Sequence, residues 1–155
     1  RISKESFDAL SFNCYALSPD HEKMNHALEI SGLPMIIGEY HFGTVDRGLA
    51  QSLWQVNSQK ERGDAFRYYT ENAFAHRGLI GTGWFRWIDQ NINGRTDGEN
   101  YNCGFIDVTD RPYPYMVDAA IKTAKSLYEI HSGTKTPFHQ APNAVGHSPI
   151  PDLWE

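Results

Sequence analysis

With 155 residues, the chain is long enough for one domain with a single hydrophobic core. Its net charge of -5 gives it no basic surface for nucleic acid, and no apolar run is long enough to cross a membrane. Cys14 and Cys103 lie far apart in the chain, so two thiols are expected rather than a disulfide.

The first predicted unit consists of a strand, a helix and a second strand. Residues 7–16 alternate apolar and polar side chains with the period of a strand, and Tyr15 falls near its carboxyl end. A helix is predicted to begin at Ser18-Pro19-Asp20 and to end at Ser31-Gly32, where glycine can adopt the left-handed cap. Two strands joined by such a helix are expected to be parallel, with a right-handed crossover.

The second strand lies in the apolar run 33–43. A continuous apolar run bounded by turn residues is typical of a strand that is buried on both faces. Because side chains alternate across a strand, Met35, Ile37 and Glu39 are predicted to share one face. If that face lies inside a barrel, Glu39 stands at the carboxyl end of the strand, where parallel α/β folds carry their catalytic groups. The alternative interpretation is an ordinary polar residue that ends a strand.

A long loop and a helix lead to the third strand. The loop covers 40–56, a length that is common in functional loops, and the helix covers 57–77. The strand covers 79–87, and its alternation brings Trp84 to the same rim as Glu39.

The rest of the chain is a second long loop, a last helix and a tail. The loop covers 88–112 and is rich in Asn, Asp and Gly, and the helix covers 113–130. Residues 132–155 contain several prolines and are expected to form an irregular tail over the surface.

Three strand–helix units with polar and aromatic residues at the strand ends indicate an α/β fold, either a doubly wound sheet or part of a (β/α)8 barrel. Three stretches resemble the carboxyl-terminal part of agarase-type and β-galactosidase-type glycoside hydrolases. They read PMIIGEYHFG (34–43), GLIGTGWFRWIDQ (78–90) and GRTDGENYNCGFIDV (94–108). The resemblance covers 7–130 and implies a partial (β/α)8 (TIM) barrel, with 1–131 as the carboxyl-terminal portion, about three strand–helix units, and 132–155 as the tail.

The resemblance also implies roles for individual residues. Glu39, on the seventh strand of such a barrel, would be the nucleophile of a retaining hydrolase, and Tyr15, on the sixth, would orient it by a hydrogen bond. Trp84, on the eighth, would form the floor of a sugar subsite, and the bond Trp84-Phe85 would be cis. The acid/base glutamate of this group follows an Asn on the fourth strand, which the chain lacks. The isolated chain is therefore expected to be an inactive fragment.

Further polar and aromatic residues near the strand ends are candidate contacts for sugar hydroxyls and rings. They are His41, Trp54, Asp89, Gln90, Glu99 and Asn100. The spacing of Asp89, Asn91, Asn93 and Gly94 resembles a calcium loop, but Asn100 occupies the final position, where a calcium loop has Glu. A sugar-binding loop or a chain of Asx turns is favoured, and no metal or cofactor is predicted.

Three classes of function fit these features. The first is a retaining glycosidase that acts on a galactose-containing polysaccharide or on β-galactosides. The second is a non-catalytic carbohydrate-binding module, and the third is an unrelated α/β domain. The expected partner is an oligo- or polysaccharide, with neither nucleic acid nor membrane. A polysaccharide-degrading parent is expected to be secreted or periplasmic, and the isolated chain is expected to form homo-oligomers through its open strand edges.

Overall fold

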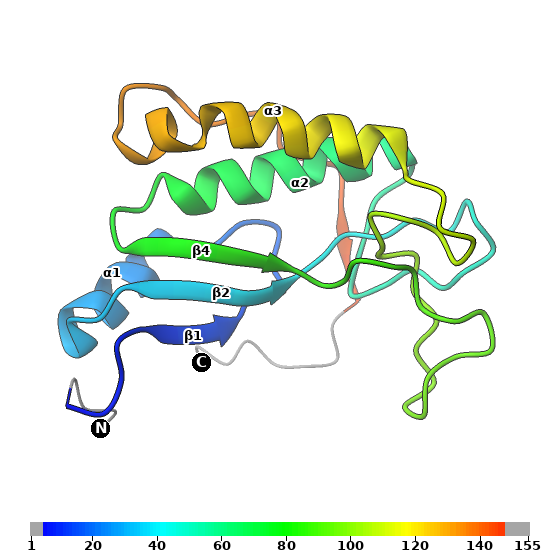
Figure 1. Ribbon diagram of the computed structural model, residues 1–155, viewed down its shortest axis with the longest axis horizontal. Coiled ribbons are helices and arrows are strands. Elements are labelled where there is room, and N and C mark those ends of the chain that lie inside the picture. The colour runs from blue at the N-terminus through cyan, green and yellow to red at the C-terminus, as the bar shows by residue number, and fades with distance from the viewer. Residues whose placement is uncertain (1–4, 148–155) are drawn as a thin grey trace.

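The computed structural model describes residues 5–147. Strands β1 (Leu10–Asn13), β2 (Met35–Tyr40) and β4 (Leu79–Trp84) form a parallel sheet in the order β1-β2-β4 (Figure 1). Helix α1 (His21–Ser31) connects β1 to β2, α2 (Gln59–Phe74) precedes β4, and α3 (Pro114–His131) follows it. Over this part of the chain, no helix is both long and apolar enough to cross a membrane.

Both ends of α1 and the start of α2 lie where the sequence predicted them, whereas α2 ends at Phe74, before the predicted 77. The Asp20 side chain accepts hydrogen bonds from the backbone N–H groups of Glu22 and Lys23 at 2.9 and 3.2 Å, which caps α1. Gly32 ends that helix with a φ of 62°, the left-handed conformation that glycine adopts without strain. Ser58 caps α2 in the same way as Asp20 caps α1.

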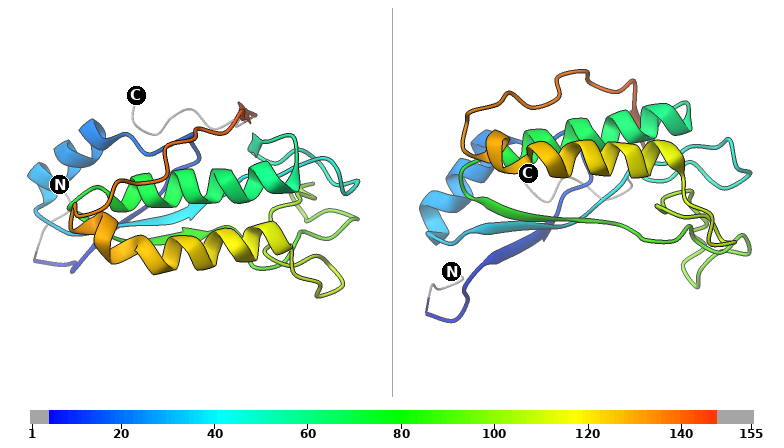
Figure 2. Two further views of the ribbon diagram at one scale, coloured as in Figure 1. Left: turned by 90° about the horizontal axis from the view of Figure 1, so that it is seen from above. Right: turned by 45° about the horizontal axis from the view of Figure 1, so that its top comes forward.

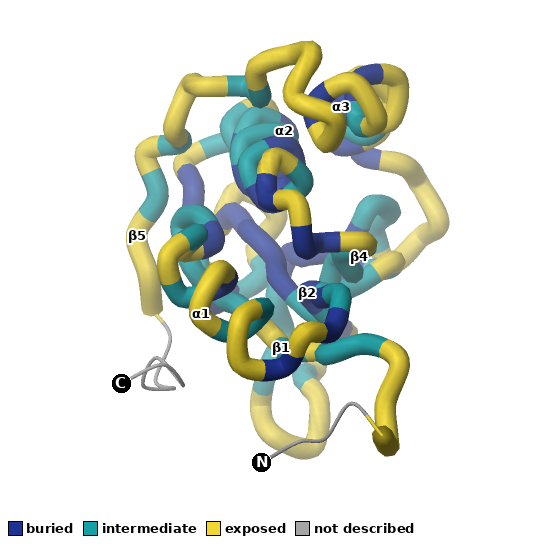
Figure 3. Tube along the Cα trace, turned by 90° about the vertical axis from the view of Figure 1, so that its left-hand side faces the viewer, coloured by how far each residue is buried: buried dark blue, intermediate teal, exposed yellow. Residues whose placement is uncertain are grey.

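All three helices lie over one face of the sheet (Figures 1 and 2). Met35 and Ile37 of β2 are fully buried there, in one cluster with Ala65 and Tyr69 of α2. Figure 3 shows buried stretches in both β2 and α2. The other face has no helix over it in the described part of the chain, and Ile80 is 55% exposed on it. Met35 and Ile37 thus share one face as predicted, but the expectation that this face lies inside a barrel is wrong, because it packs against the helices.

The first strand is shorter than predicted. Pairing with β2 runs only from Leu10 opposite Met35 to Asn13 opposite Glu39, so β1 covers four residues rather than 7–16. The residues before Leu10 extend past the start of β2 and therefore have no neighbouring strand to bind.

A second, two-stranded sheet joins the chain after α3 to the loop after β2. Strand β3 (Trp54–Gln55) pairs antiparallel with β5 (Val145–Gly146). On its way to β5, the segment after α3 crosses the helix layer, where the Phe138 N–H donates to Glu71 at 2.8 Å (Figure 2). The predicted irregular tail therefore contains a short strand, and its part over 148–155 lies outside the described residues.

Candidate active site at the carboxyl ends of the strands

The carboxyl ends of the three parallel strands carry two long loops on the same side of the molecule (Figure 1). The β2–α2 loop covers 41–58, and the β4–α3 loop covers 85–113. Side chains that follow neighbouring strands meet at this edge because parallel strands end side by side.

Glu39 and Tyr15 meet at this edge. The Tyr15 hydroxyl donates a 2.8 Å hydrogen bond to Oε2 of Glu39. The backbone brings them together, because the Cys14 N–H donates to the Glu39 carbonyl at 2.9 Å, directly before Tyr15. Burial is the larger cause, and the hydrogen bond to Glu39 the next, of a raised pKa of Tyr15. The phenol therefore stays protonated and acts as the donor. The predicted contact between these two side chains is confirmed.

A break in the alternation of β2 determines where Glu39 points. Met35, Ile37 and Tyr40 all belong to the core beneath the helices, although strict alternation would place Tyr40 on the opposite face. The pairing register of β2 with β4 shifts between Ile37 and Tyr40, as at a β-bulge. Tyr40 therefore takes the position that faces the helices, and the Glu39 side chain points toward Tyr15 instead of into that core.

Tyr15 is held by side chains from the β2–α2 loop and from α2. The indole N–H of Trp54 donates to the Tyr15 carbonyl at 2.8 Å, and the Tyr69 hydroxyl donates to the preceding carbonyl, that of Cys14, at 2.6 Å. His41 presents its ring to the Tyr15 ring in a T-shaped contact at 5.0 Å. The segment after β1 is thus bound on both its backbone and its ring.

The two tryptophans that were predicted as sugar contacts use their indole N–H groups within the protein. Trp54 bonds Tyr15, and Gly146 of β5 approaches its ring so closely that an added Cβ would lie 3.0 Å away. Trp84 donates to the Cys103 carbonyl at 2.6 Å, and its half-buried ring makes T-shaped contacts with Tyr40, Phe66 and Phe105. The cis peptide is Phe85-Arg86, so the prediction at Trp84-Phe85 is wrong by one bond.

Asp89 is the centre of the β4–α3 loop. It is only 4% exposed and accepts hydrogen bonds from the amide of Asn102, the N–H of Gly104 and the hydroxyl of Tyr113. The calcium-loop pattern is not formed, since its first carboxylate points into the protein, and residues 5–147 contain no group of three His, Cys, Asp or Glu arranged to hold a metal. Asp89 binds the loop together instead of facing a sugar.

The other three predicted contacts in this loop differ in exposure. Gln90 is fully buried, donating to Glu99 at 2.7 Å and accepting from the N–H of Tyr101 at 2.6 Å. Glu99 also lies 3.4 Å from Arg95, and Asn100 donates to the loop at 3.5 Å. Both Glu99 and Asn100 are partly exposed, so these two can reach a ligand.

Arg62 of α2 binds the backbone of the β4–α3 loop, a role that the sequence analysis missed. It is fully buried, its guanidinium donates to the carbonyls of Asn102 and Gly104, and it lies over the Tyr113 ring at 4.4 Å. Gln59, one turn earlier on α2, donates to Asn102 at 2.7 Å. A signal was available, because Arg62 precedes the buried Ala65 by three residues and so shares its helix face.

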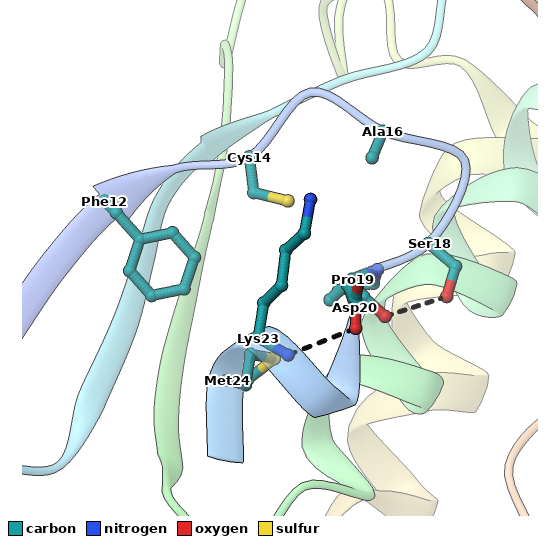
Figure 4. Close-up of a pocket in the computed structure, with 8 residues that line it drawn as sticks. All are labelled: Phe12, Cys14, Ala16, Ser18, Pro19, Asp20, Lys23 and Met24. Atoms are coloured by element: carbon teal, nitrogen blue, oxygen red, sulfur yellow. Dashed lines mark hydrogen bonds between the residues drawn. The ribbon is translucent and has the colours of Figure 1, made fainter. Parts of the chain in front are cut away.

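One pocket lies where the chain passes from the carboxyl end of β1 to α1. It has a volume of about 100 Å³ and is formed by the end of β1 and the start of α1, with Lys23 extending across it toward Cys14 (Figure 4). Neither Tyr15 nor Glu39 lines it.

The sequence of this chain aligns with those of known proteins over most of its length, although no family model matches it. Over 128 residues it is 40% identical to β-agarase A and 38% identical to β-agarase B of Vibrio sp. strain JT0107. The chain is homologous to part of the β-agarases. The agarase-type resemblance of the sequence motifs is thereby confirmed. Each alignment covers 78% of this chain but only 13% of the relative, so the chain spans a small part of these enzymes.

A solved agarase structure shares the fold of this β-agarase homologue. The structure of an exo-β-agarase superposes on 84% of this chain with a TM-score of 0.79 and 37% identity, and the match covers 18% of that protein. The α/β arrangement of helices and strands described above is therefore that of a segment of an agarase.

Proposed function

We propose that this chain is part of a glycoside hydrolase that cleaves a galactose-containing polysaccharide such as agarose, with Glu39 as its nucleophile. The observation that carries the proposal is the 2.8 Å bond from the Tyr15 hydroxyl to Glu39 at the ends of two adjacent parallel strands. A carboxylate at this position, oriented by a hydrogen-bond donor, is suited to nucleophilic attack on a sugar. The β-agarase relatives support the polysaccharide as the substrate class.

The proposed architecture of the whole protein is a (β/α)8 barrel, of which these strands would form three neighbours toward the carboxyl terminus. Two features support it over a doubly wound sheet. The strands follow one another across the sheet in chain order, and the helices all lie on one face. A doubly wound sheet reverses its strand order and carries helices on both faces.

The proposed reaction has two steps. An oxygen of Glu39 attacks the anomeric carbon of the galactose unit, the bond to the leaving oxygen breaks, and a second carboxyl group gives that oxygen its proton. Water then attacks the same carbon, the second group takes its proton, and Glu39 leaves as a carboxylate. In retaining enzymes the two carboxyl groups stand about 5–5.5 Å apart. We assign the second carboxyl group to a part of the enzyme outside this chain, since the chain spans 13% of its relatives.

Sugar recognition is assigned to the partly exposed residues of the same edge. Glu99 and Asn100 are proposed to bind sugar hydroxyls, and the half-buried faces of Trp84 and Trp54 to contact sugar rings. Asp89 and Gln90 are proposed to act indirectly by shaping the loop that carries Glu99.

The test is to trap the covalent intermediate in the complete enzyme that contains this chain. An activated 2-deoxy-2-fluoro-β-galactoside should add its fluorosugar to the peptide that contains Glu39, as measured by mass spectrometry after proteolysis, and Glu39→Gln should abolish the label. Labelling of another carboxylate would overturn the assignment. Binding of agarose oligosaccharides without any hydrolysis would instead favour a non-catalytic carbohydrate-binding module.

A further inference from the structure

His41 lies two residues after Glu39 and packs against the side chain that binds Glu39. Its ring is 1% exposed and meets the Tyr15 ring at 5.0 Å with an interplanar angle of 68°. On another side it meets the Tyr101 ring at 5.8 Å. His41 therefore limits where the Tyr15 ring can move.

His41 is itself fixed by two backbone groups from different loops. The Leu53 N–H donates to Nε2 at 3.1 Å, so Nε2 is the unprotonated nitrogen. Nδ1 then carries the proton and donates to the Phe85 carbonyl at 3.0 Å. Leu53 lies in the β2–α2 loop and Phe85 directly follows β4. The ring thus ties the ends of β2 and β4 together beside Tyr15.

We infer that His41 is a positioning residue of the proposed hydrolase, which keeps the Tyr15 hydroxyl aimed at Glu39. The inference rests on the proposed function, and it replaces the expectation that His41 binds a sugar. Both of its ring nitrogens are engaged by backbone groups, so a sugar hydroxyl would have to displace one of these bonds. Trp54 completes the arrangement by binding the Tyr15 carbonyl, while His41 restrains the ring.

The reaction makes this restraint useful. Glu39 changes from carboxylate to ester and back, and its hydrogen-bond donor must stay in place while the charge appears and disappears. A displacement of about 1 Å at a reacting group can cost about 100-fold in rate. A ring fixed at both nitrogens keeps the Tyr15 hydroxyl in place without contacting the sugar.

A double-mutant cycle in the complete enzyme tests the inference, with kcat and KM measured on an aryl β-galactoside or an agarose oligosaccharide. Tyr15→Phe and His41→Phe are each expected to lower kcat about 10- to 100-fold, the effect of losing one charge-assisted hydrogen bond, with little change in KM. The double variant should be no slower than Tyr15→Phe alone, because His41 acts through the Tyr15 hydroxyl. If kcat of the double variant falls by the product of the two single-variant losses, the two residues act independently and the inference is overturned.

A second variant covers the case in which His41→Phe does not fold. His41→Gln provides one N–H donor and one carbonyl acceptor but no ring, and it too should lose activity only when Tyr15 is present. His26→Gln, at an exposed position of α1, is the matched control and should behave as the wild type. Wild-type kcat in a folded His41→Gln variant would contradict the role.

A spectroscopic measurement separates failure of this inference from failure of the proposed function. If the wild-type enzyme hydrolyses no galactoside, the proposed function fails, and ¹⁵N spectra of the histidine rings then decide the inference. A neutral His41 with its proton on Nδ1 at pH 6, with contacts to the Tyr15 ring, supports the positioning geometry. An imidazolium at that pH, or a proton on Nε2, overturns it.

Discussion

The guanidinium of Arg62 lies 4.4 Å above the ring of Tyr113, at the point where α2 meets the β4–α3 loop. The Tyr113 hydroxyl donates to Asp89, so a buried cation and a buried carboxylate share one aromatic neighbour. Burial lowers the pKa of Arg62, and Asp89 is the main charge that opposes this shift. This network supports the loop that carries the candidate sugar-binding residues Glu99 and Asn100.

Replacing Arg62 with Met should lower the free energy of unfolding by on the order of 3 kcal/mol, because the change leaves buried Asp89 without its cation and two carbonyls without donors. Urea denaturation of the purified chain measures the change. Arg77→Met, at an exposed position, is the control and should stay within about 0.5 kcal/mol of the wild type. Equal stability of Arg62→Met and the wild type would show that the network adds nothing.

The 155-residue chain by itself should not hydrolyse an aryl β-galactoside above background. It carries the proposed nucleophile Glu39, whereas we assign the general acid to a part of the enzyme outside this chain, and loss of a general acid typically removes about two to four orders of magnitude in rate. Release of nitrophenol from the purified chain is the measurement. Turnover that disappears in Glu39→Gln would mean that a complete site exists within these residues.

The stability of the chain should fall between pH 6.5 and pH 4. Burial lowers the pKa of His41 to about 4, whereas an unfolded histidine titrates near 6.5. In that window the unfolded state binds more protons, so stability falls as the pH falls and is fully retained above it. The loss should reach on the order of 3 kcal/mol at pH 4.

Denaturation curves over this range, compared with those of His41→Gln, isolate the contribution of His41. The variant should lack most of this pH dependence, since glutamine does not titrate. An identical slope in both proteins would assign the acid sensitivity to other groups.

The isolated chain should self-associate into a dimer or a larger oligomer. Both β1 and β4 have β2 as their only neighbour in the described sheet, so each presents an open edge. Ile80 is exposed on the uncovered face, and α3 exposes Ile121 and Tyr128. Sedimentation velocity at micromolar concentrations measures the state. A stable monomer that unfolds cooperatively would contradict this prediction.

Local patterns in the sequence were enough to predict the strand–helix units and the proximity of Glu39 to Tyr15. Asp20, Gly32 and Ser58 mark helix ends through bonds within a few residues, so their effect can be read without the fold. Parallel strands that follow one another in the chain usually lie side by side, so their carboxyl ends were expected to meet, and the resemblance to glycoside hydrolases implied the bond between Tyr15 and Glu39.

Only the tertiary structure decided which way the side chains near the strand ends point. Alternation correctly put Met35 and Ile37 on one face of β2, but the assignment of that face to a barrel interior was wrong. Which face the helices cover is settled by packing and not by the local sequence. The same holds for Asp89 and His41, which as polar residues could face solvent or be buried. Their partners lie more than ten residues away in the chain, and such a polar group is buried only where folding brings donors and acceptors to it.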